Sequence, residues 1–407
     1  MDETKYNLVV DTTHRGGVAK TGEKIFFHAI LRGARSTSKI YDGTIRWKLF
    51  RNGVLMSTGE FPAASHAAGV TLVPDRPGYY RCDFAAVAGG EPVARGALGV
   101  LADPDAIRSG VELPADFDDF WAEQRKKLYD APPNLRARHL ETVCGLETCD
   151  VTADCPGTAP IRGLRMHPAA AAPHSLPAVL TLQGAGVRTS GNDYQACLAQ
   201  RGFLTLDINA HGIENDLSPS KCLELAETEF AGYPARGFDT GDPGKVYFLG
   251  MFLRVLRAID IIKTSPLWDG RTLILWGASQ GAWQCFAGAA LSDSVTCLCV
   301  CIPAGCDIAG GGWPSARLSG AVRQAELAKT IPYFDGVNLC TRIDGDVPAL
   351  FSIGLIDDAC RADGVVAAYN NLKSKHKKLA VHCESGHDAN HGGYVAEQLD
   401  FILRHLR

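Results

Sequence analysis

Hydrophobic and polar positions alternate along the first hundred residues of the chain. Residues 45–49 and 27–31 both repeat with a period of two, which is typical of strands that bury one face. An Asn-Gly pair at positions 52–53 separates two apolar runs and predicts a hairpin turn. We therefore expect residues 1–102 to form a domain of short strands, an immunoglobulin-like β-sandwich.

Tyr80 supports this prediction, because it stands two residues before Cys82, as the tyrosine of a tyrosine corner does. No other cysteine precedes Cys144, so the usual inter-sheet disulfide cannot form within this domain. The domain either binds carbohydrate or shapes an active-site entrance, or it is a packing or assembly module. We favour the second interpretation, since a fold does not imply a function.

A different pattern follows the expected linker at residues 102–105. Asp116 is expected to cap a helix that runs to Leu128 and buries an aromatic face. From about Val151, apolar strands alternate with amphipathic helices, which predicts a mostly parallel sheet covered on both faces. Strands are expected at residues 178–182, 203–208, 272–276, 295–302, 347–355 and 379–383, and helices at 246–264, 365–374 and 395–406.

The motif G-x-S-x-G at residues 277–281 lies between a strand and an Ala-rich helix. This context is that of a nucleophile elbow, in which a strained turn exposes the serine hydroxyl. Gly277 and Gly281 flank Ser279, where the strand and helix backbones come so close that a β-carbon would collide with them. Ser279 could instead merely cap the helix. The flanking elements favour a nucleophile, and residues 103–407 are predicted to be an α/β-hydrolase domain with a helical lead-in.

The acid and the base of such a hydrolase follow the serine in the order Ser, Asp, His. Asp357 and Asp358 end the strand 347–355, and at most one of them can face the histidine. Position after the last strand favours His387 as the base. His391 is an alternative, and His382 is the weakest candidate because it lies inside a strand.

Catalysis by Ser279 requires donors for an oxyanion. We expect the backbone N–H of Gln280, directly after the nucleophile, and one N–H from the glycine-rich loop 183–186, for which Ala185 is chosen.

Composition sets the remaining bounds. Of the 407 residues, 46% are hydrophobic and 21% are charged, with 41 basic against 45 acidic side chains. This balance gives no basic face for nucleic acid, and no apolar run is long enough for a membrane. The start at Met1 lacks the pattern of a signal peptide, so the protein is either cytoplasmic or secreted after removal of a signal. Cys144, Cys149 and Cys155 lack zinc-site spacing and are expected to be ordinary thiols.

Six segments in the region 114–407 carry a more specific resemblance: 116–121, 277–281, 333–335, 354–357, 367–370 and 387–388. In this order they resemble the acetylxylan esterase and cephalosporin C deacetylase family, carbohydrate esterase family 7. The resemblance implies that Asp357 is the acid, because it stands two places after Gly-Leu, and that His387 is the base. It also implies removal of acetyl groups from a sugar or sugar-like alcohol, without metal or cofactor.

The chain departs from the family pattern at residues 183–185, at 209–212 and after the elbow, and the N-terminal β-domain lies outside the usual architecture. These departures concern substrate preference and oligomeric state, and a homo-oligomer is possible. Trp283, Trp313 and His211 are candidates for substrate contact, although Trp283 is more readily explained as a core residue of its helix. The expected partner is an acetylated sugar or oligosaccharide.

Two other functions share some of these features. A serine peptidase of the prolyl oligopeptidase type has the same elbow and triad order, but it typically carries a propeller, and the sequence has no repeat period. A non-catalytic carbohydrate-binding protein with a decayed site is the other alternative. The presence of Ser279, Asp357 and His387 together argues against it.

Overall fold

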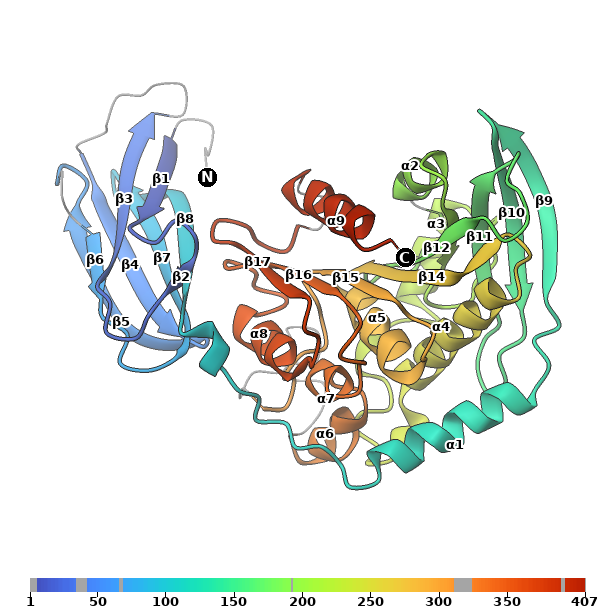
Figure 1. Ribbon diagram of the computed structural model, residues 1–407. Helices are drawn as coiled ribbons and strands as arrows, with labels where there is room; N and C mark the ends of the chain where they lie inside the picture. The colour runs from blue at the N-terminus through green and yellow to red at the C-terminus, as the bar shows by residue number, and fades with distance from the viewer. Residues whose placement is uncertain are drawn as a thin grey trace. The chain divides into compact units, whose positions relative to one another are not determined.

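The chain forms two compact units in the computed structural model, which describes residues 6–33, 42–65, 69–191, 193–310, 324–388 and 392–406. Unit 1 comprises residues 1–108, 353–370 and 380–388. Unit 2 comprises residues 109–352, 371–379 and 389–407. Figure 1 labels the helices and strands of both units. Unit 1 is thus assembled from three segments, the first of which is far from the other two in the sequence.

The N-terminal part of unit 1 is built from two sheets with a shared apolar core. The smaller sheet has the order β1-β3-β6 and the larger one β2-β8-β7-β4-β5. The strands are β1 (Tyr6–Thr12), β2 (Val18–Ala19), β3 (Ile25–Gly33), β4 (Thr44–Arg51), β5 (Val54–Pro62), β6 (Gly69–Leu72), β7 (Gly78–Ala88) and β8 (Glu91–Ala102). The short helix η1 (Pro104–Ala106) follows.

Two local predictions for this region are confirmed. The hairpin between β4 and β5 turns at Asn52 and Gly53, whose φ angles of 46° and 77° are both positive, as a type I′ turn requires. The Tyr80 hydroxyl donates to the Arg76 carbonyl oxygen at 2.8 Å, which is the backward bond of a tyrosine corner. The core includes Tyr80 and Cys82, both buried.

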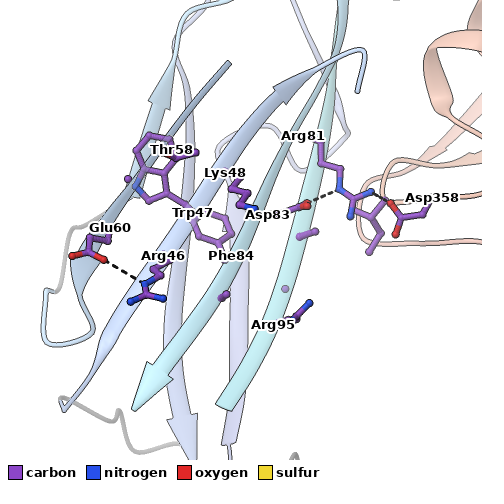
Figure 2. Close-up of a pocket in the computed structure, with 15 residues that line it drawn as sticks. Arg46, Trp47, Lys48, Thr58, Glu60, Arg81, Asp83, Phe84, Arg95 and Asp358 are labelled. Carbon is purple, nitrogen blue, oxygen red and sulfur yellow. Dashed lines mark hydrogen bonds and ion pairs between the residues drawn. The ribbon is translucent and has the colours of Figure 1, made fainter. Parts of the chain in front are cut away.

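The outer face of the larger sheet is hollowed by a cavity of about 900 Å³. Figure 2 shows its charged lining, and six of these side chains come from β4, β5, β7, β8 and the loop after β16: Arg46, Lys48, Glu60, Arg81, Arg95 and Asp358. Trp47, which also borders the cavity, packs against the core of the sandwich. Every residue of this lining belongs to unit 1.

The third sheet has nine strands in the order β17-β16-β15-β14-β12-β13-β11-β10-β9. The strands are β9 (Arg136–Val143), β10 (Leu146–Ala153), β11 (Ile161–Pro168), β12 (Leu176–Leu182), β13 (Leu204–Ile208), β14 (Trp268–Ala278), β15 (Cys297–Cys301), β16 (Ala349–Gly354) and β17 (Lys377–His382). Strands β13, β12, β14, β15 and β16 are parallel, whereas β9, β10, β11 and β13 pair antiparallel. The prediction of a mostly parallel sheet is confirmed.

Helices cover both faces of this sheet. Figure 1 shows α4 and α5 against one face and α2 and α9 against the other. The helices are α1 (Phe117–Asp130), α2 (Asp193–Gln200), α3 (Pro219–Glu227), α4 (Tyr247–Lys263), α5 (Gln280–Leu291), α6 (Gln324–Thr330), α7 (Gly336–Cys340), α8 (Ala362–Asn371) and α9 (Gly392–Arg404), with the 3₁₀ turns η2 (Tyr233–Ala235), η3 (Pro243–Lys245) and η4 (Ile331–Tyr333). Among the described residues, no helix combines the length and apolarity of a bilayer span.

The prediction that the Asp116 side chain caps α1 was wrong. Asp116 occupies the N-cap position without a side-chain bond to the helix, because its Oδ1 accepts a hydrogen bond from the Tyr333 hydroxyl at 2.6 Å. The aromatic face of α1 is buried as expected. Trp121 donates from Nε1 to the Tyr333 carbonyl oxygen at 2.9 Å, so α1 is joined to η4 by both residues.

Candidate active site

Ser279 lies in a strained turn between β14 and α5. Its φ of 54° and ψ of −120° are unusual for a residue with a side chain, and such strain persists only where surrounding structure imposes it. A β-carbon at Gly281 would lie 2.0 Å from the Leu182 carbonyl oxygen, and one at Gly277 would lie 2.5 Å from the carbonyl carbon of Gly281. The steric reason given for both glycines is confirmed.

Backbone hydrogen bonds hold Ser279 in this conformation. Its N–H donates to the Cys301 carbonyl oxygen at 3.0 Å, and its own carbonyl oxygen accepts from Trp283 at 3.2 Å and from Ala304 at 3.1 Å. The turn is therefore tied to the end of β15, to the loop that follows it, and to the first turn of α5.

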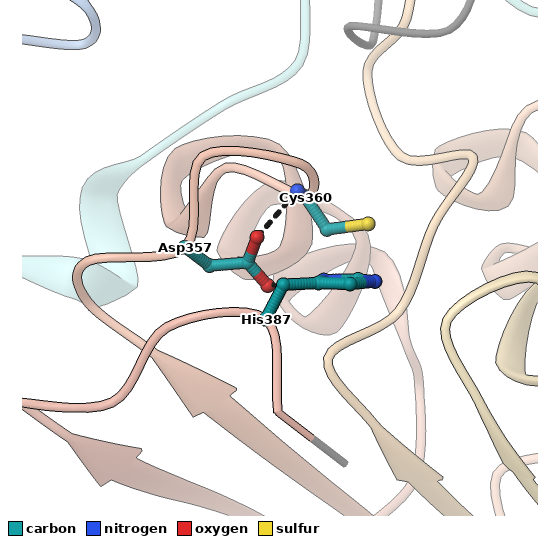
Figure 3. Close-up of side chains that lie close together, drawn as sticks. All are labelled: Asp357, Cys360 and His387. Carbon is teal, nitrogen blue, oxygen red and sulfur yellow. Dashed lines mark hydrogen bonds and ion pairs between the residues drawn. The ribbon is translucent and has the colours of Figure 1, made fainter.

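Asp357 and His387 form a hydrogen-bonded pair in unit 1, at the ends of β16 and β17. Asp357 Oδ2 lies 2.8 Å from His387 Nδ1, and Oδ1 accepts from the N–H groups of Ala359 and Cys360, each at 2.8 Å. The Asp357 side chain is 1% exposed and that of His387 is 31% exposed. A buried carboxylate thus orients an accessible imidazole (Figure 3).

The neighbouring candidates are placed differently. The Asp358 side chain is 81% exposed and forms an ion pair with Arg81, so it does not face His387. His382 lies within β17, where its carbonyl oxygen accepts from the Leu355 N–H at 3.0 Å. His391 falls outside the described residues. Of the two adjacent aspartates, Asp357 is the one that the structure brings to the predicted base.

The glycine-rich loop after β12 borders Ser279 within unit 2. A β-carbon at Gly184 would lie 3.9 Å from the Ser279 β-carbon. Within the described part of the chain, no hydrogen bond engages the backbone N–H of Ala185 or of Gln280, whereas the N–H of Gly186 donates to the Tyr233 hydroxyl at 3.1 Å. These two free N–H groups are compatible with the predicted oxyanion donors.

Tyr233 joins the two segments that carry these donors, and sequence reasoning missed it. Its buried hydroxyl accepts from Gly186 N–H and donates to Gln280 Oε1 at 2.7 Å. A lone tyrosine in a loop gives no local signal of such a link, because each of its two partners lies 47 residues away in the sequence.

Two of the residues predicted to contact substrate, Trp283 and His211, are buried. Trp283 donates from Nε1 to the Phe334 carbonyl oxygen at 2.6 Å and packs in the core, as the alternative interpretation has it. His211 is also buried, with Nδ1 2.8 Å from the Tyr247 hydroxyl oxygen. Burial, assisted by the positive charge of Arg254, lowers the pKa of His211 to about 4, so its imidazole is neutral. Trp313 lies outside the described residues.

Cys360 is a further neighbour of the Asp357–His387 pair that the sequence did not indicate. Asp357, Cys360 and His387 each place one possible metal-ligand atom within 4.8 Å of those of the other two. Among the described residues, this is the only group of three His, Cys, Asp or Glu side chains arranged in this way. An O, S and N donor set is one that zinc accepts. The carboxylate is, however, already hydrogen-bonded through both oxygens, which suits the orientation of a general base.

The chain matches known esterases over most of its length. A model of the family "Acetyl xylan esterase (AXE1)" matches residues 101–309 and 319–405. The acetyl esterase Axe7A of Xylanibacter ruminicola is 26% identical over 288 residues, which are 68% of this chain and 64% of Axe7A. The aligned part therefore spans somewhat less than two thirds of that relative's length.

Two solved structures share the fold. An acetyl xylan esterase from Paenibacillus sp. R4 is 24% identical, covers 74% of this chain and 98% of its own, and gives a TM-score of 0.62. Acetyl xylan esterase 1 from Thermoanaerobacterium sp. JW/SL YS485 is 22% identical, covers 75% of this chain and 98% of its own, and gives a TM-score of 0.63. The predicted fold of the large domain is confirmed.

Proposed function

Because the chain belongs to the acetyl xylan esterase family, we propose that it hydrolyses acetyl esters of carbohydrates with Ser279 as the nucleophile. His387 is the general base and Asp357 the acid that orients it. The natural substrate in this proposal is an acetylated xylo-oligosaccharide or a similar sugar. The names of the relatives, an acetyl esterase and two acetyl xylan esterases, support this substrate class.

The proposed reaction has two half-reactions. Ser279 Oγ bonds to the acetyl carbon as His387 Nε2 takes the hydroxyl proton, and the sugar oxygen then leaves with that proton. Water next gives a proton to His387 and attacks the acetyl-enzyme, and acetic acid leaves as Ser279 recovers its proton from His387; the acid then ionises to acetate in solution. Asp357 stays ionised and stabilises the imidazolium in both halves, because its Oδ2 is bonded to Nδ1.

The tetrahedral intermediates need N–H donors for the negative oxygen. We assign these to Gln280 and Ala185, whose N–H groups have no hydrogen bond to another described group. Tyr233 supports the assignment, because its hydroxyl joins Gly186 to Gln280. The observation that carries the whole proposal is the strained conformation of Ser279, which serves no purpose for a mere helix cap.

Acyl-chain preference tests the function. Each buried methylene adds about 0.8 kcal/mol, so a roomy acyl pocket favours butyrate, whereas a closed one opposes it at about 1–3 kcal/mol. We expect kcat/KM to fall at least about tenfold from p-nitrophenyl acetate to the butyrate, a difference of about 1.4 kcal/mol. Ser279→Ala is the control for background hydrolysis. Faster hydrolysis of the butyrate or the octanoate would instead indicate a general carboxylesterase.

A further inference from the structure

The loops that carry Asp357 and His387 share a compact unit with the N-terminal sandwich. Residues 353–370 and 380–388 group with residues 1–108. The family match begins only at residue 101, so the strands that contact these loops lie almost entirely outside the matched region. The sandwich is therefore a feature of this chain that the family does not explain.

Tyr79 of β7 makes the innermost contact. Its side chain is buried, with 3% of the residue exposed, and its hydroxyl donates to the Leu355 carbonyl oxygen. Leu355 lies two residues before Asp357 in the loop after β16. Since a buried carbonyl oxygen without a partner is costly, this bond fixes the start of the acid loop to a strand of the sandwich.

Gly99 of β8 makes the contact tight and extends it to the base loop. A β-carbon there would lie 2.5 Å from the Leu355 β-carbon, so only glycine allows the strand to approach this closely. The Gly99 N–H donates to the Cys383 carbonyl oxygen at 3.4 Å. Cys383 lies four residues before His387, so one strand of the sandwich touches both loops.

Arg81 holds Asp358, the residue that follows Asp357. Its guanidinium donates to Asp83 in the same strand at 2.5 Å and also to Asp358. Figure 2 shows the three side chains in line, with Arg81 between the two carboxylates. The Arg81 side chain is only 17% exposed, and its second partner is the residue directly after Asp357.

We propose that the N-terminal sandwich positions the catalytic acid, with Tyr79 and Arg81 as positioning residues. Asp357 cannot adjust independently of its loop, because Oδ1 is bonded to two N–H groups of that loop and Oδ2 to His387. A displaced loop therefore carries the imidazole with it. The inference rests on the roles proposed above for Asp357 and His387.

Tyr79→Phe tests the proposal, with Tyr80→Phe as the matched control. Both tyrosines lie in β7, and both hydroxyls donate to a backbone carbonyl oxygen, but Tyr80 bonds to Arg76 within the sandwich. We expect Tyr79→Phe to lower kcat for p-nitrophenyl acetate about tenfold with little change in KM, since a misplacement near 1 Å can cost about a hundredfold. Tyr80→Phe should keep kcat within about twofold.

The rate is expressed per active serine, counted by complete titration with a fluorophosphonate. Partial unfolding lowers the number of titrated serines, whereas a misplaced acid lowers the rate at each of them. A Tyr79→Phe enzyme with a wild-type rate per serine, or one no slower than Tyr80→Phe, would overturn the positioning role. Failure of the proposed function looks different, because the wild-type enzyme would then hydrolyse no ester in a Ser279-dependent way.

Arg81→Met gives a second measurement if Tyr79→Phe does not fold. Its control is Arg46→Met. Arg46 lies on the same sheet face, and its guanidinium pairs with Glu60 at 3.5 Å. We expect Arg81→Met to lower the rate per serine two- to threefold, because the Asp358 partner is exposed. Equal rates in the two variants would contradict the role of Arg81.

Discussion

The proposed nucleophile and the proposed acid–base pair are built in opposite ways. The turn at Ser279 is permitted by its sequence neighbours Gly277 and Gly281, and the backbone bonds that hold it outside β14 and α5 reach to Cys301 and Ala304, within about 25 residues. Asp357 and His387 lie 30 residues apart on two loops, and these loops contact strands that precede them by more than 250 residues. A local motif can thus specify the first part of the site, whereas the second part depends on long-range contacts.

The largest expected effect comes from removing either reacting side chain. Ser279→Ala and His387→Ala should each lower kcat by several orders of magnitude, and the double variant should lose little more, because such residues act as a unit. Steady-state kinetics with p-nitrophenyl acetate measures this, and circular dichroism checks the fold. A nearly active His387→Ala together with an inactive His391→Ala would assign the base to His391. The contrast between the local serine turn and the loops of Asp357 and His387 would then no longer hold.

The next effect separates the two aspartates. Asp357→Asn should lower kcat by up to about 10⁴-fold, because an amide favours the wrong imidazole tautomer and cannot balance its charge. Asp358→Asn should stay within about threefold of wild type, since it alters only an exposed ion pair with Arg81. Parallel measurement of kcat in both variants decides the matter, and the reverse pattern would assign the acid to Asp358.

The smallest effect is expected from Tyr233, which joins the two segments that carry the proposed oxyanion donors beside Ser279. Tyr233→Phe leaves Gly186 N–H and Gln280 Oε1 without their bridging hydroxyl, and we expect kcat to fall about tenfold. This is less than the 10²–10³-fold loss from deleting an oxyanion donor, because Tyr233 acts through other residues. Affinity for a boronic acid transition-state analogue should fall in proportion.

Tyr247→Phe is the control for Tyr233→Phe, since its hydroxyl bonds to neither donor segment directly and reaches the donor loop only through His211, whose Nε2 lies 3.3 Å from the Gly186 carbonyl oxygen. Equal losses in the two variants would show that general packing, and not the link between the donor segments, sets the rate. The nucleophile side would then depend on the elbow alone.

The sequence allowed prediction of what short-range sterics and periodicity control. The elbow, the hairpin at Asn52 and the tyrosine corner at Tyr80 each follow from a few adjacent residues. Strand β9 was not predicted, because residues 136–143 are exposed throughout and bury no periodic face. Strands β10 and β11 do bury residues but were not predicted one by one either. Chain order indicated the acid and base, but the choice of Asp357 over Asp358 depended on family resemblance.

Long-range side-chain bonds account for the misses. Asp116 bonds to Tyr333 more than two hundred residues away and so does not cap its helix. His211 and Trp283 are polar or amphipathic residues whose partners lie in other elements, and both are packed in the interior. The bonds of Tyr79 and Arg81 span 276 and 277 residues. No local pattern distinguishes such residues from ordinary strand positions.

The discontinuity of unit 1 has a consequence for synthesis on the ribosome. Residues 1–108 leave the ribosome long before residues 353–388 are made, and at about 5–20 residues per second the interval is roughly 12 to 50 seconds. During that time Tyr79 and Gly99 have no acid loop to contact. The sandwich must therefore remain soluble with this surface uncovered, and the proposed site is completed only after residues 353–388 have been translated.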